Sequence, residues 1–565
     1  MGLIRPDLPD FDVDQWSTRP EGERVRMMCE SWALQGFGAP LGAYLFYLVK
    51  IALYIGLWLL FATRTSAFGG VSNISAWWSQ PIAFQKAIVW TMLFEVLGLG
   101  CGSGPLTGRY LPPVVAFTHF LRPGTIRLPP FPNRVPLTAG HRRTVVDALL
   151  YAALIALSLR ALLWSGRLLG AALLWPIVVA VPLIGLRDKT VFLAARAEHY
   201  WTTLLVFLIA GSDVKVMFAG AMVVQLAIWW GAAASKLNRH FPNVITIMVS
   251  NSPIIGSRAL KRLMYVDHPS DLRPSRVARA LAHGGTAIEF TFPLVLAISR
   301  GGLPTDVALG VMLAFHLFIT SCFPMGVPIE WNVLFVYSMF VLFGAHSAVS
   351  PLEVTHRPLL VVLLVTGLIS GPVYGAFRPD RVSFLPGLRF YAGNWAASLW
   401  LFRKGQEARL DECVTKTAPT IPRQLSRLYD DQVVQSVGGK LRAFRSMHVH
   451  GRALNALLAR AVDDLADYDV TEGEGVAGVV LGWNFGDGHL HQEQLLSAVQ
   501  HECGFASGDL RCVFLESQPI NKPWMQWRIV DAADGRIAEG RILVADLLTH
   551  QPWPEDEAIQ TEVAQ

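Results

Sequence analysis

Lys236 lies where one of the apolar segments of the chain ends, in the stretch "WWGAAASKLNRHF" (residues 229–241). Burial against hydrocarbon removes water from an amine and disfavours its charged form. A neutral amine is a competent base or nucleophile, so Lys236 is a candidate general base in an apolar pocket lined by Trp229 and Trp230. The alternative is that Lys236 belongs to the basic residues that follow a membrane span on its cytoplasmic side, with the two tryptophans serving only for packing.

Three further ionisable side chains lie inside apolar segments or at their start. Glu289 lies in "GGTAIEFTFPLVLAI", His316 lies in "GVMLAFHLFITSCF", and His199 opens "HYWTTLLVFLIAG". Ionisable residues at membrane depth are costly and are therefore candidates for function. We predict that Glu289 pairs with Lys236 or with His316, and that Glu289 or His199 takes the proton onward. The alternatives are a hydrogen bond that locks helices together for Glu289 and His316, and a position among lipid head groups for His199.

The composition predicts that these residues belong to a membrane protein. Of the 565 residues, 52% are hydrophobic and 16% are charged, whereas soluble proteins carry about a quarter charged residues. A helix needs about 20 apolar residues to cross a bilayer. We predict an all-α polytopic bundle of about eight to ten transmembrane helices, followed by a C-terminal cytoplasmic α+β domain. The candidate spans are 41–62, 84–102, 144–163, 168–186, 199–212, 214–235, 284–300, 304–323, 331–346 and 357–376.

Lysine and arginine are distributed unevenly between the loops of this ten-span scheme. The loops 103–143, 187–198 and 236–283 are rich in them, whereas 63–83 and 347–356 are nearly free of them. Because basic loops stay on the cytoplasmic side, we predict a multi-pass protein of the plasma membrane with both termini in the cytoplasm. The net charge of +5 then reflects the basic loops that set the orientation in the membrane, and no nucleic-acid partner is expected.

Three parts are predicted along the chain: an N-terminal cytoplasmic segment (1–40), a transmembrane domain (41–376) and a soluble α+β domain (377–565). In the last part, "AGVVLGWNFGDG" is strand-like, "HQEQLLSAVQHEC" has the pattern of an amphipathic helix, and "LRCVFLESQP" is a second strand. "WMQWRIVDAADGRIAEGRILVADL" predicts a hairpin because an Asp-Gly pair separates two alternating runs. The segment around 422–464 predicts helices with a break at Gly438-Gly439.

Histidines of the C-terminal part resemble metal ligands only at first sight. They are His448, His450, His489, His491 and His501. A His-x-His pair without cysteine partners at zinc-site spacing, and without a His-Glu-x-x-His motif, is no specific signal. We therefore predict no metal site.

Several of the stretches together resemble a known family. "LRDKTVFLAARAEHYW" (186–201), "GAAASKLNRHF" (231–241) and "IEFTFPLVLAI" followed by "AFHLFITSCF" resemble segments of vitamin K-dependent γ-carboxylase and of the wider horizontally transferred transmembrane domain superfamily. The similarity covers roughly residues 140–400. The whole chain resembles more closely an uncharacterised family of actinobacterial transmembrane proteins related to that superfamily.

The resemblance implies roles for individual residues. It places Lys236 on the lysine that acts as base on a quinol, and Asp188, Lys189 and Thr190 on an Asp-Lys-Thr triplet. His199 corresponds to a histidine after the triplet, although four extra residues separate the two in this chain. Asp188 and Lys189 are thereby expected at the substrate, and a menaquinone-like quinone is the implied cofactor. The Asn-His pair of the carboxylase is replaced here by "AEH", so carboxylation of a peptide does not follow.

Two hypotheses of different class follow from the sequence. In the first, the protein is a membrane enzyme that acts on a lipid-soluble substrate (a quinone, polyprenyl or acyl lipid), with Lys236 as general base. In the second, it is a non-catalytic lipid-binding, transport or complex-assembly accessory of the cell envelope. A membrane lipid or quinone is the expected partner in both, with a homo-oligomer or a cytoplasmic protein docked on the C-terminal domain as a further expectation.

Overall fold

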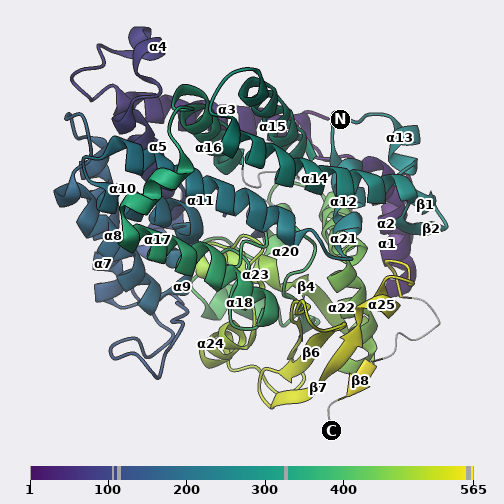
Figure 1. Cartoon of the computed structure of the whole chain (residues 1–565). Helices are drawn as coiled ribbons and strands as arrows, with labels where there is room; N and C mark the ends of the chain where they lie inside the picture. The colour runs from purple at the N-terminus through teal and green to yellow at the C-terminus, as the bar shows by residue number, and fades with distance from the viewer. Residues whose placement is uncertain are drawn as a thin grey trace.

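The computed structural model describes residues 2–102, 104, 107–110, 116–322, 329–554 and 561–563. Helices make up most of these residues, and a six-stranded sheet lies in the C-terminal part (Figure 1). The apolar helices and the sheet occupy opposite sides of the molecule (Figure 1). This confirms the predicted combination of a helical membrane bundle with a C-terminal α+β part.

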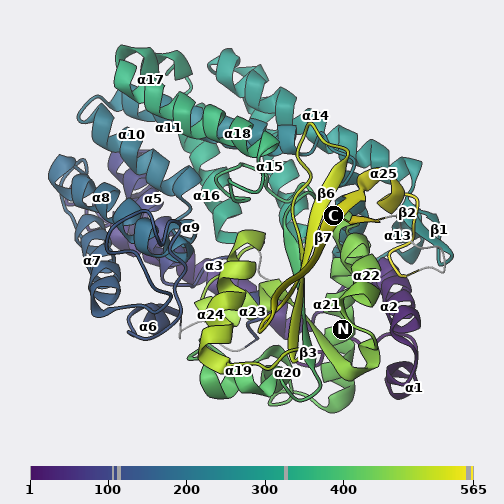
Figure 2. The same ribbon diagram turned by 90° about the horizontal axis from the view of Figure 1, so that it is seen from below.

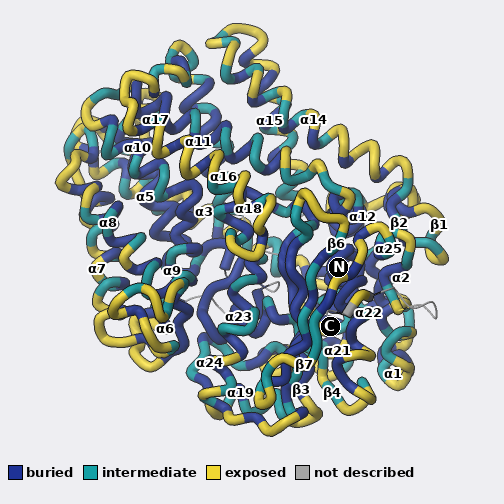
Figure 3. The backbone as a smooth tube through the Cα atoms, turned by 60° about the horizontal axis from the view of Figure 1, so that its bottom comes forward, coloured by how far each residue is buried: buried dark blue, intermediate teal, exposed yellow. Residues whose placement is uncertain are grey.

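Six helices of the described residues are long and apolar enough to cross a membrane. They are α3 (Leu41–Ala62), α7 (Val145–Leu162), α11 (Val214–Ser235), α14 (Arg276–Ser299), α15 (Leu303–Cys322) and the continuous stretch Pro358–Phe377. Their 18 to 24 residues give lengths of roughly 27–36 Å, which match a hydrocarbon core of about 30 Å. Helix α11 is the most buried of the six, and the others expose apolar faces to the surroundings (Figure 3).

Six is fewer than the eight to ten spans that the sequence predicts. The other apolar segments form shorter helices: α5 (Pro81–Val96), α8 (Ala171–Arg187), α10 (Thr202–Ala210) and α16 (Ile329–Met339). Every residue of α5 from Ile82 to Val96 is buried. A helix that is apolar on all sides because protein surrounds it has the same composition as one surrounded by lipid, so composition alone does not distinguish the two.

Helix α14 joins two elements that the sequence separates. The end of the predicted loop 236–283 and the predicted span 284–300 form one helix of 24 residues, capped at its start by the Ser275 side chain. The stretch Pro358–Phe377 is also continuous, running through α17 (Pro358–Val365), a π-helical turn η7 (Thr366–Ser370) and α18 (Gly371–Phe377). Two Gly residues at 284–285 therefore do not interrupt α14, because no turn is required there.

The sheet is antiparallel, with the strand order β4-β3-β5-β6-β7-β8. Strand β5 (Leu510–Leu515) and the hairpin of β6 (Trp524–Asp531) and β7 (Gly535–Leu543) are where the sequence predicts them. Gly535 has φ +83°, as a turn after Asp534 demands. The other strands are β3 (Ala397–Arg403), β4 (Tyr468–Glu472) and β8 (Thr561–Val563).

Two predictions about the helices of this part are wrong. The strand-like "AGVVLGWNFGDG" contains the end of a helix, α23 (Gly473–Leu481), because its apolar run is buried on every side and lacks a two-residue alternation. The break at Gly438-Gly439 does not occur: α21 (Asp431–Met447) continues through it, and α22 (Val449–Ala461) begins only after His448. A Cβ on Gly439 would approach Trp16 and Met28 within 2.8 Å, so this glycine allows close helix packing.

The hydrophobic core continues across the predicted boundary at residue 376. One buried cluster joins apolar residues of the bundle with residues of β3, α23 and α24 (Glu493–Cys503). A second joins the N-terminal helices α1 (Val13–Ser17) and α2 (Glu21–Gln35) with α21, and these elements lie side by side (Figure 2). The membrane helices and the C-terminal part therefore share one interior.

The remaining elements are short connections. They are η1 (Val71–Asn73), α4 (Ile74–Trp77), α6 (Ala116–Phe120), α9 (Lys189–Ala194), η4 (Ala197–Trp201), α12 (Phe241–Asn251), α13 (Arg258–Arg262), β1 (Tyr265–Asp267), β2 (Asp271–Pro274), η5 (Phe340–Ala345), η6 (Pro351–His356), α19 (Ala408–Cys413), α20 (Ile421–Leu425), η8 (Leu465–Asp467), η9 (Gly488–Leu490) and α25 (Val544–Leu547).

Candidate functional site

Lys236 and Glu289 form an ion pair at the end of α11. The Lys236 ammonium lies 2.5 Å from a carboxylate oxygen of Glu289 on α14, and the two side chains are 10% and 6% exposed. The rings of Phe241 and Phe315 lie 5.6 and 5.8 Å from the ammonium nitrogen. Of the two pairings that the sequence leaves open, Glu289 with Lys236 is the one present. The amine is thus held by a carboxylate and two aromatic faces instead of pointing into water.

The pair lies in the wall of a cavity of about 560 Å³, which we call the inner cavity. Helices α11, α12, α14, α15 and α16 form most of its wall, and aromatic residues of the segment 384–391 and Phe485 close it from the C-terminal part. Its lining is largely apolar, and exposed Leu281 and Phe318 lie at its rim. A hollow of this size and lining suits an apolar molecule with a small polar group. Its lining residues with a guanidinium, amine, carboxylate, imidazole or amide group are Arg196, Lys236, Glu289, His316 and Asn332.

Trp229 and His316 also line the inner cavity and are bonded to each other. The indole N–H of Trp229 donates to Nε2 of His316 at 3.1 Å, and His316 Nδ1 lies 2.9 Å from Oδ1 of Asn332. Since Nε2 accepts a proton donor, Nδ1 carries the hydrogen and donates to the amide oxygen. The imidazole is therefore neutral in this arrangement, with its tautomer fixed by its two neighbours.

His199 lies one layer behind the cavity wall. Its Nδ1 accepts a hydrogen bond from the indole N–H of Trp331 at 3.0 Å, and the ring of Phe335 packs against it at 5.0 Å. Trp331 and Phe335 line the inner cavity, whereas His199 does not. His199 consequently fixes the orientation of a wall residue and does not itself face the inner cavity.

Arg196 belongs to the site although the sequence places it among the basic loop residues. Its backbone has φ +45°, and its side chain is fully buried. Nε donates to Glu198 at 2.6 Å, while Nη1 and Nη2 have no hydrogen-bond partner in the described part of the chain. The guanidinium lies 5.0 Å from the ring centre of Trp331 and 5.6 Å from that of Phe390. Four N–H donors at the cavity wall therefore lack an acceptor.

The other predicted site residues lie elsewhere. Asp188 is ion-paired with Arg143 at 2.5 Å, and Lys189 donates to the carbonyl oxygen of His489 at 3.0 Å. These contacts tie the segment after α8 to its neighbours and leave neither side chain at the inner cavity. Trp230 donates to the carbonyl oxygen of Phe290 at 3.2 Å and faces the opposite side of α11. The structure thus brings Lys236, Glu289, Trp229 and His316 together, with His199 behind them.

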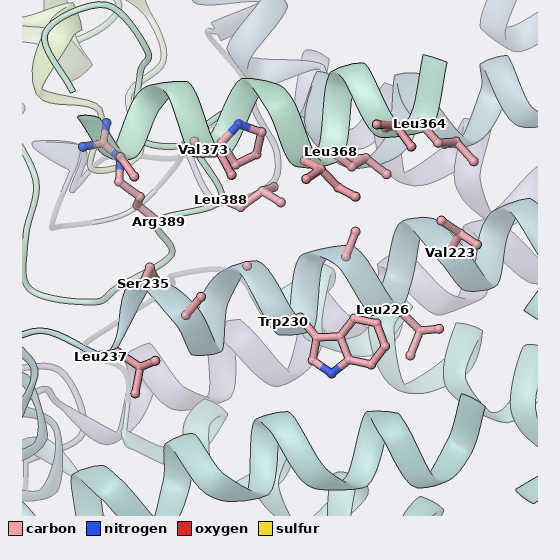
Figure 4. Close-up of a pocket in the computed structure, with 18 of the residues that line it drawn as sticks. Val223, Leu226, Trp230, Ser235, Leu237, Leu364, Leu368, Val373, Leu388 and Arg389 are labelled. Atoms are coloured by element: carbon pink, nitrogen blue, oxygen red, sulfur yellow. The ribbon is translucent and has the colours of Figure 1, made fainter. Parts of the chain in front are cut away.

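A second hollow lies on that opposite side of α11, and we call it the lateral groove. It has a volume of about 1100 Å³ and runs between α11 and the stretch α17–α18 (Figure 4). Leu226 and Trp230 line it from α11, and Leu364, Leu368 and Val373 line it from the other side (Figure 4). Because neighbouring residues of a helix point about 100° apart, α11 serves as the wall of both hollows.

The histidines of the C-terminal part lie in different surroundings. His448 and His450 stack at 4.9 Å in the core, and burial, reinforced by Arg445, lowers the pKa of His448 to about 3. The described residues contain one group with metal-like spacing, His141, His501 and Glu502, whose ligand atoms lie within 4.8 Å of one another. Both carboxylate oxygens of Glu502 already bind Arg142, at 2.7 and 2.6 Å, which removes the negative charge that a cation would need.

Comparison with known proteins places the chain in a family. The family model described as "Transmembrane protein of unknown function (DUF3556)" matches residues 1–564. No curated protein and no solved structure matches the chain. The match extends over the membrane helices and the C-terminal sheet alike, in agreement with their common core. The chain therefore belongs to the DUF3556 family of transmembrane proteins.

Proposed function

We propose that the inner cavity binds a lipid-soluble molecule and that Lys236, as general base, acts on its polar end. The protein is then a membrane enzyme for a quinone, polyprenyl or acyl lipid. The observation that carries this proposal is the ion pair of Lys236 with Glu289 in the wall of an otherwise apolar cavity of about 560 Å³. Charged pairs are costly in such surroundings, and they concentrate where chemistry uses them.

Proton transfer within the pair would make the amine a base. With the proton on Lys236 the pair is zwitterionic, and with the proton on Glu289 both groups are neutral. An apolar ligand that displaces water from the cavity disfavours the zwitterion, because separated charges lose solvation in a low dielectric. Ligand entry would therefore move the proton across the 2.5 Å contact and leave a neutral amine facing the ligand.

Arg196 indicates which kind of polar end fits. Its Nη1 and Nη2 are buried at the cavity wall without an acceptor among the described residues. Leaving a buried donor unsatisfied costs about 1–3 kcal/mol. A carbonyl, carboxyl or phosphate oxygen of the ligand would remove this cost, so we expect an oxygen acceptor at the head of the molecule.

The orientation in the membrane is part of the same proposal. The N-terminal residues pack against the C-terminal part, with Arg5 ion-paired to Asp430 at 2.9 Å. The N-terminal segment and the C-terminal part would then share one side of the membrane, and the basic loops support the cytoplasmic side of a plasma membrane for both. Fusion of a reporter that is active on only one side of the membrane, at either terminus, tests this placement.

A non-catalytic lipid-binding role is the second candidate. The observation that favours it is the closeness of the ion pair, since a lysine held by a carboxylate at 2.5 Å keeps its proton. In this version the inner cavity holds the lipid, and the Lys236–Glu289 pair only joins α11 to α14.

Lipid extraction followed by mass spectrometry tests binding. We expect the protein purified gently into nanodiscs to retain a specific lipid that the charge-balanced variant Lys236→Met/Glu289→Leu also retains. Ala232→Trp, which fills the inner cavity from α11, should lose it. If wild type and Ala232→Trp retain the same lipids in the same amounts, the inner cavity is no binding site.

Complementation of a deletion strain separates the two candidates. If Lys236→Met/Glu289→Leu retains the lipid but fails to restore growth or envelope composition, the enzyme is supported. Full restoration by this variant would contradict catalysis by Lys236 and favour the accessory role. Lys236→Arg with Glu289 intact serves as the matched control, because it keeps the charge and removes a usable base.

A further inference from the structure

The lateral groove has the shape of a slot for one extended chain. Its walls are the apolar side of α11 from Val223 to Ser235 and the facing side of α17–α18. Twelve helical steps along α11 correspond to about 18 Å, enough for most of an acyl chain. Ile298, Leu352 and Ile369 on its rim are more than half exposed, so the slot is open along its side to the surroundings.

The groove differs from an ordinary crevice between membrane helices in its charges. Three arginines line it: Arg239 and Arg389 near the C-terminal end of α11, and Arg300 after α14. Its described lining includes neither aspartate nor glutamate. Basic side chains with no acidic side chain in the same wall produce a positive potential, which attracts an anion into the groove.

Arg389 forms no ion pair within the described part of the chain and is only 8% exposed, although the more distant carboxylates of Glu516 and Asp487 favour its charged form. Its Nη2 donates to the carbonyl oxygen of Val382 at 2.6 Å, and its Nε has no hydrogen-bond partner among the described residues. No carboxylate of the described chain forms an ion pair with Arg389 or Arg239. An arginine at the edge of a membrane that is neither paired nor exposed is costly. An anion at this end of the groove would remove that cost.

The polar end of the groove is rigid before any ligand arrives. The Asn394 amide donates to the carbonyl oxygen of Gln518 and its side-chain oxygen accepts from the Gln518 N–H, both at 2.8 Å. The N–H of Ile520 donates to the carbonyl oxygen of Ala376 at 2.9 Å and so fixes this segment to the end of α18. The C-terminal part thus closes the groove with amide groups beside the two arginines.

We propose that the lateral groove binds an anionic phospholipid. One acyl chain lies between α11 and α18, and the phosphate accepts hydrogen bonds from Arg239 and Arg389. Arginine is suited to phosphate oxygens because its planar guanidinium presents several donors at once. A neutral lipid would fill the slot but leave the arginines unpaired, and free phosphate would pair with them but leave the slot empty. This site is independent of the chemistry at Lys236, from which α11 separates it.

The test compares lipids with identical chains. The full-length protein in detergent is titrated with dioleoyl phosphatidylglycerol, dioleoyl phosphatidylcholine or inorganic phosphate, and bound lipid is counted by native mass spectrometry alongside thermal unfolding. We expect phosphatidylglycerol to bind about tenfold more tightly than phosphatidylcholine, because one charge-assisted hydrogen bond is worth this much. Phosphate alone should neither compete with it nor stabilise the protein at equal concentration.

Three variants locate the preference. Arg239→Gln, at an exposed position, and Arg239→Gln/Arg389→Gln should reduce or abolish the preference for phosphatidylglycerol while binding phosphatidylcholine as before. Arg279→Gln removes an exposed arginine on α14 that lines neither hollow, and should keep the preference. Any of four results would overturn the proposal. Wild type could bind both lipids equally, or phosphate alone could stabilise the protein as much as phosphatidylglycerol does. The preference for phosphatidylglycerol could also survive in Arg239→Gln/Arg389→Gln or be lost in Arg279→Gln.

Discussion

The inner cavity and the lateral groove share α11 as a wall, yet they treat charge in opposite ways. In the inner cavity Lys236 is paired with Glu289, and Arg196 with Glu198. In the groove the arginines have no acidic neighbour in the lining. Apolar volume alone therefore does not tell two hollows apart. The balance of charges does: internal pairs suit the exchange of a proton with the polar end of a ligand, and cations without an acidic residue in the same wall suit a ligand that brings its own negative charge.

The charged side chains of the two hollows also differ in their exposure to water. The side chains of the Lys236–Glu289 pair are 10% and 6% exposed, so removing one partner leaves a charge with little solvent. Arg239 is exposed and can extend along the surface toward water, as long basic side chains do near membranes. Substitutions at the inner cavity should therefore affect stability, and those at the groove should affect ligand preference. The following predictions test this contrast.

The largest effect is expected from Glu289→Leu, which leaves the Lys236 ammonium buried without its partner. We expect a loss of about 3–5 kcal/mol in the free energy of unfolding, as for other broken buried pairs. Denaturant unfolding in detergent measures it. Lys236→Met/Glu289→Leu should regain most of the loss, and a Glu289→Leu variant as stable as wild type would mean that the pair is not buried in the folded protein.

Acidification should lower the free energy of unfolding, because two buried histidines stay neutral in the folded protein. Burial lowers the pKa of His448 to about 3 and that of His240 to about 4, although a hydrogen bond to Gln518 raises the latter. Both are neutral when folded, and the unfolded chain takes up protons below its ordinary pKa of about 6.5. Stability is thus complete above that pH and falls as the pH drops toward 4, by about 3 kcal/mol per histidine at pH 4.5.

His240 lies at the polar end of the lateral groove, where its Nε2 is 2.8 Å from the Gln518 side chain. Denaturant unfolding between pH 7 and 4.5 measures the loss of stability. His448→Asn should have a shallower dependence of unfolding free energy on pH. The same slope as wild type would show that His448 does not titrate with unfolding.

A bulky side chain in the groove should weaken lipid binding without changing the inner cavity. Ala227→Phe projects from α11 between the walls of the groove. We expect about tenfold weaker binding of phosphatidylglycerol, or about 1.4 kcal/mol, while Ala232→Trp on the other side of α11 should leave this binding unchanged. If both variants weaken it equally, the two hollows are not separate sites.

The smallest effect is expected from Trp331→Phe, which removes the N–H that donates to His199 at 3.0 Å and keeps the aromatic wall. We expect a loss of about 1 kcal/mol in unfolding free energy, plus a small gain in mobility of the cavity wall. Unfolding curves measure the loss of stability, and the rate at which bound inner-cavity lipid exchanges measures the mobility of the cavity wall. A change in phosphatidylglycerol preference in this variant would contradict the separation of the hollows.

The sequence predicts the parts of the site that are unusual for their surroundings. Lys236, Glu289 and His316 are ionisable residues in apolar segments. Because burying such a residue in a membrane costs free energy, its presence there already indicates a candidate for function. Arg196 is missed because an arginine in a basic loop has the same appearance whether it faces water or turns inward. What turns it inward is a left-handed backbone at φ +45° and a Glu two residues later, and only the latter is visible in the sequence.

The fold is predicted where pattern and environment agree. Spans such as α3 and α15 and the β6–β7 hairpin have lengths and alternations that specify one structure. Helix α5 is shorter than the predicted span 84–102, and α23 is predicted as a strand; both helices are buried on all sides. Full burial removes the periodic contrast between apolar and polar faces, and with it the information that distinguishes these environments.

The packing of the N-terminal helices on α21 has a consequence for biosynthesis. Lys440 donates to the backbone carbonyl of Asp7, 433 positions earlier, and Trp32 packs against Phe444 with ring centres 5.5 Å apart. At 5–20 residues per second the ribosome needs on the order of tens of seconds to supply these partners. Until then α2 exposes the apolar face that carries Trp32. Nascent chains halted after the last span should therefore be easily digested ahead of α3 and require a holding chaperone, whereas finished chains should resist.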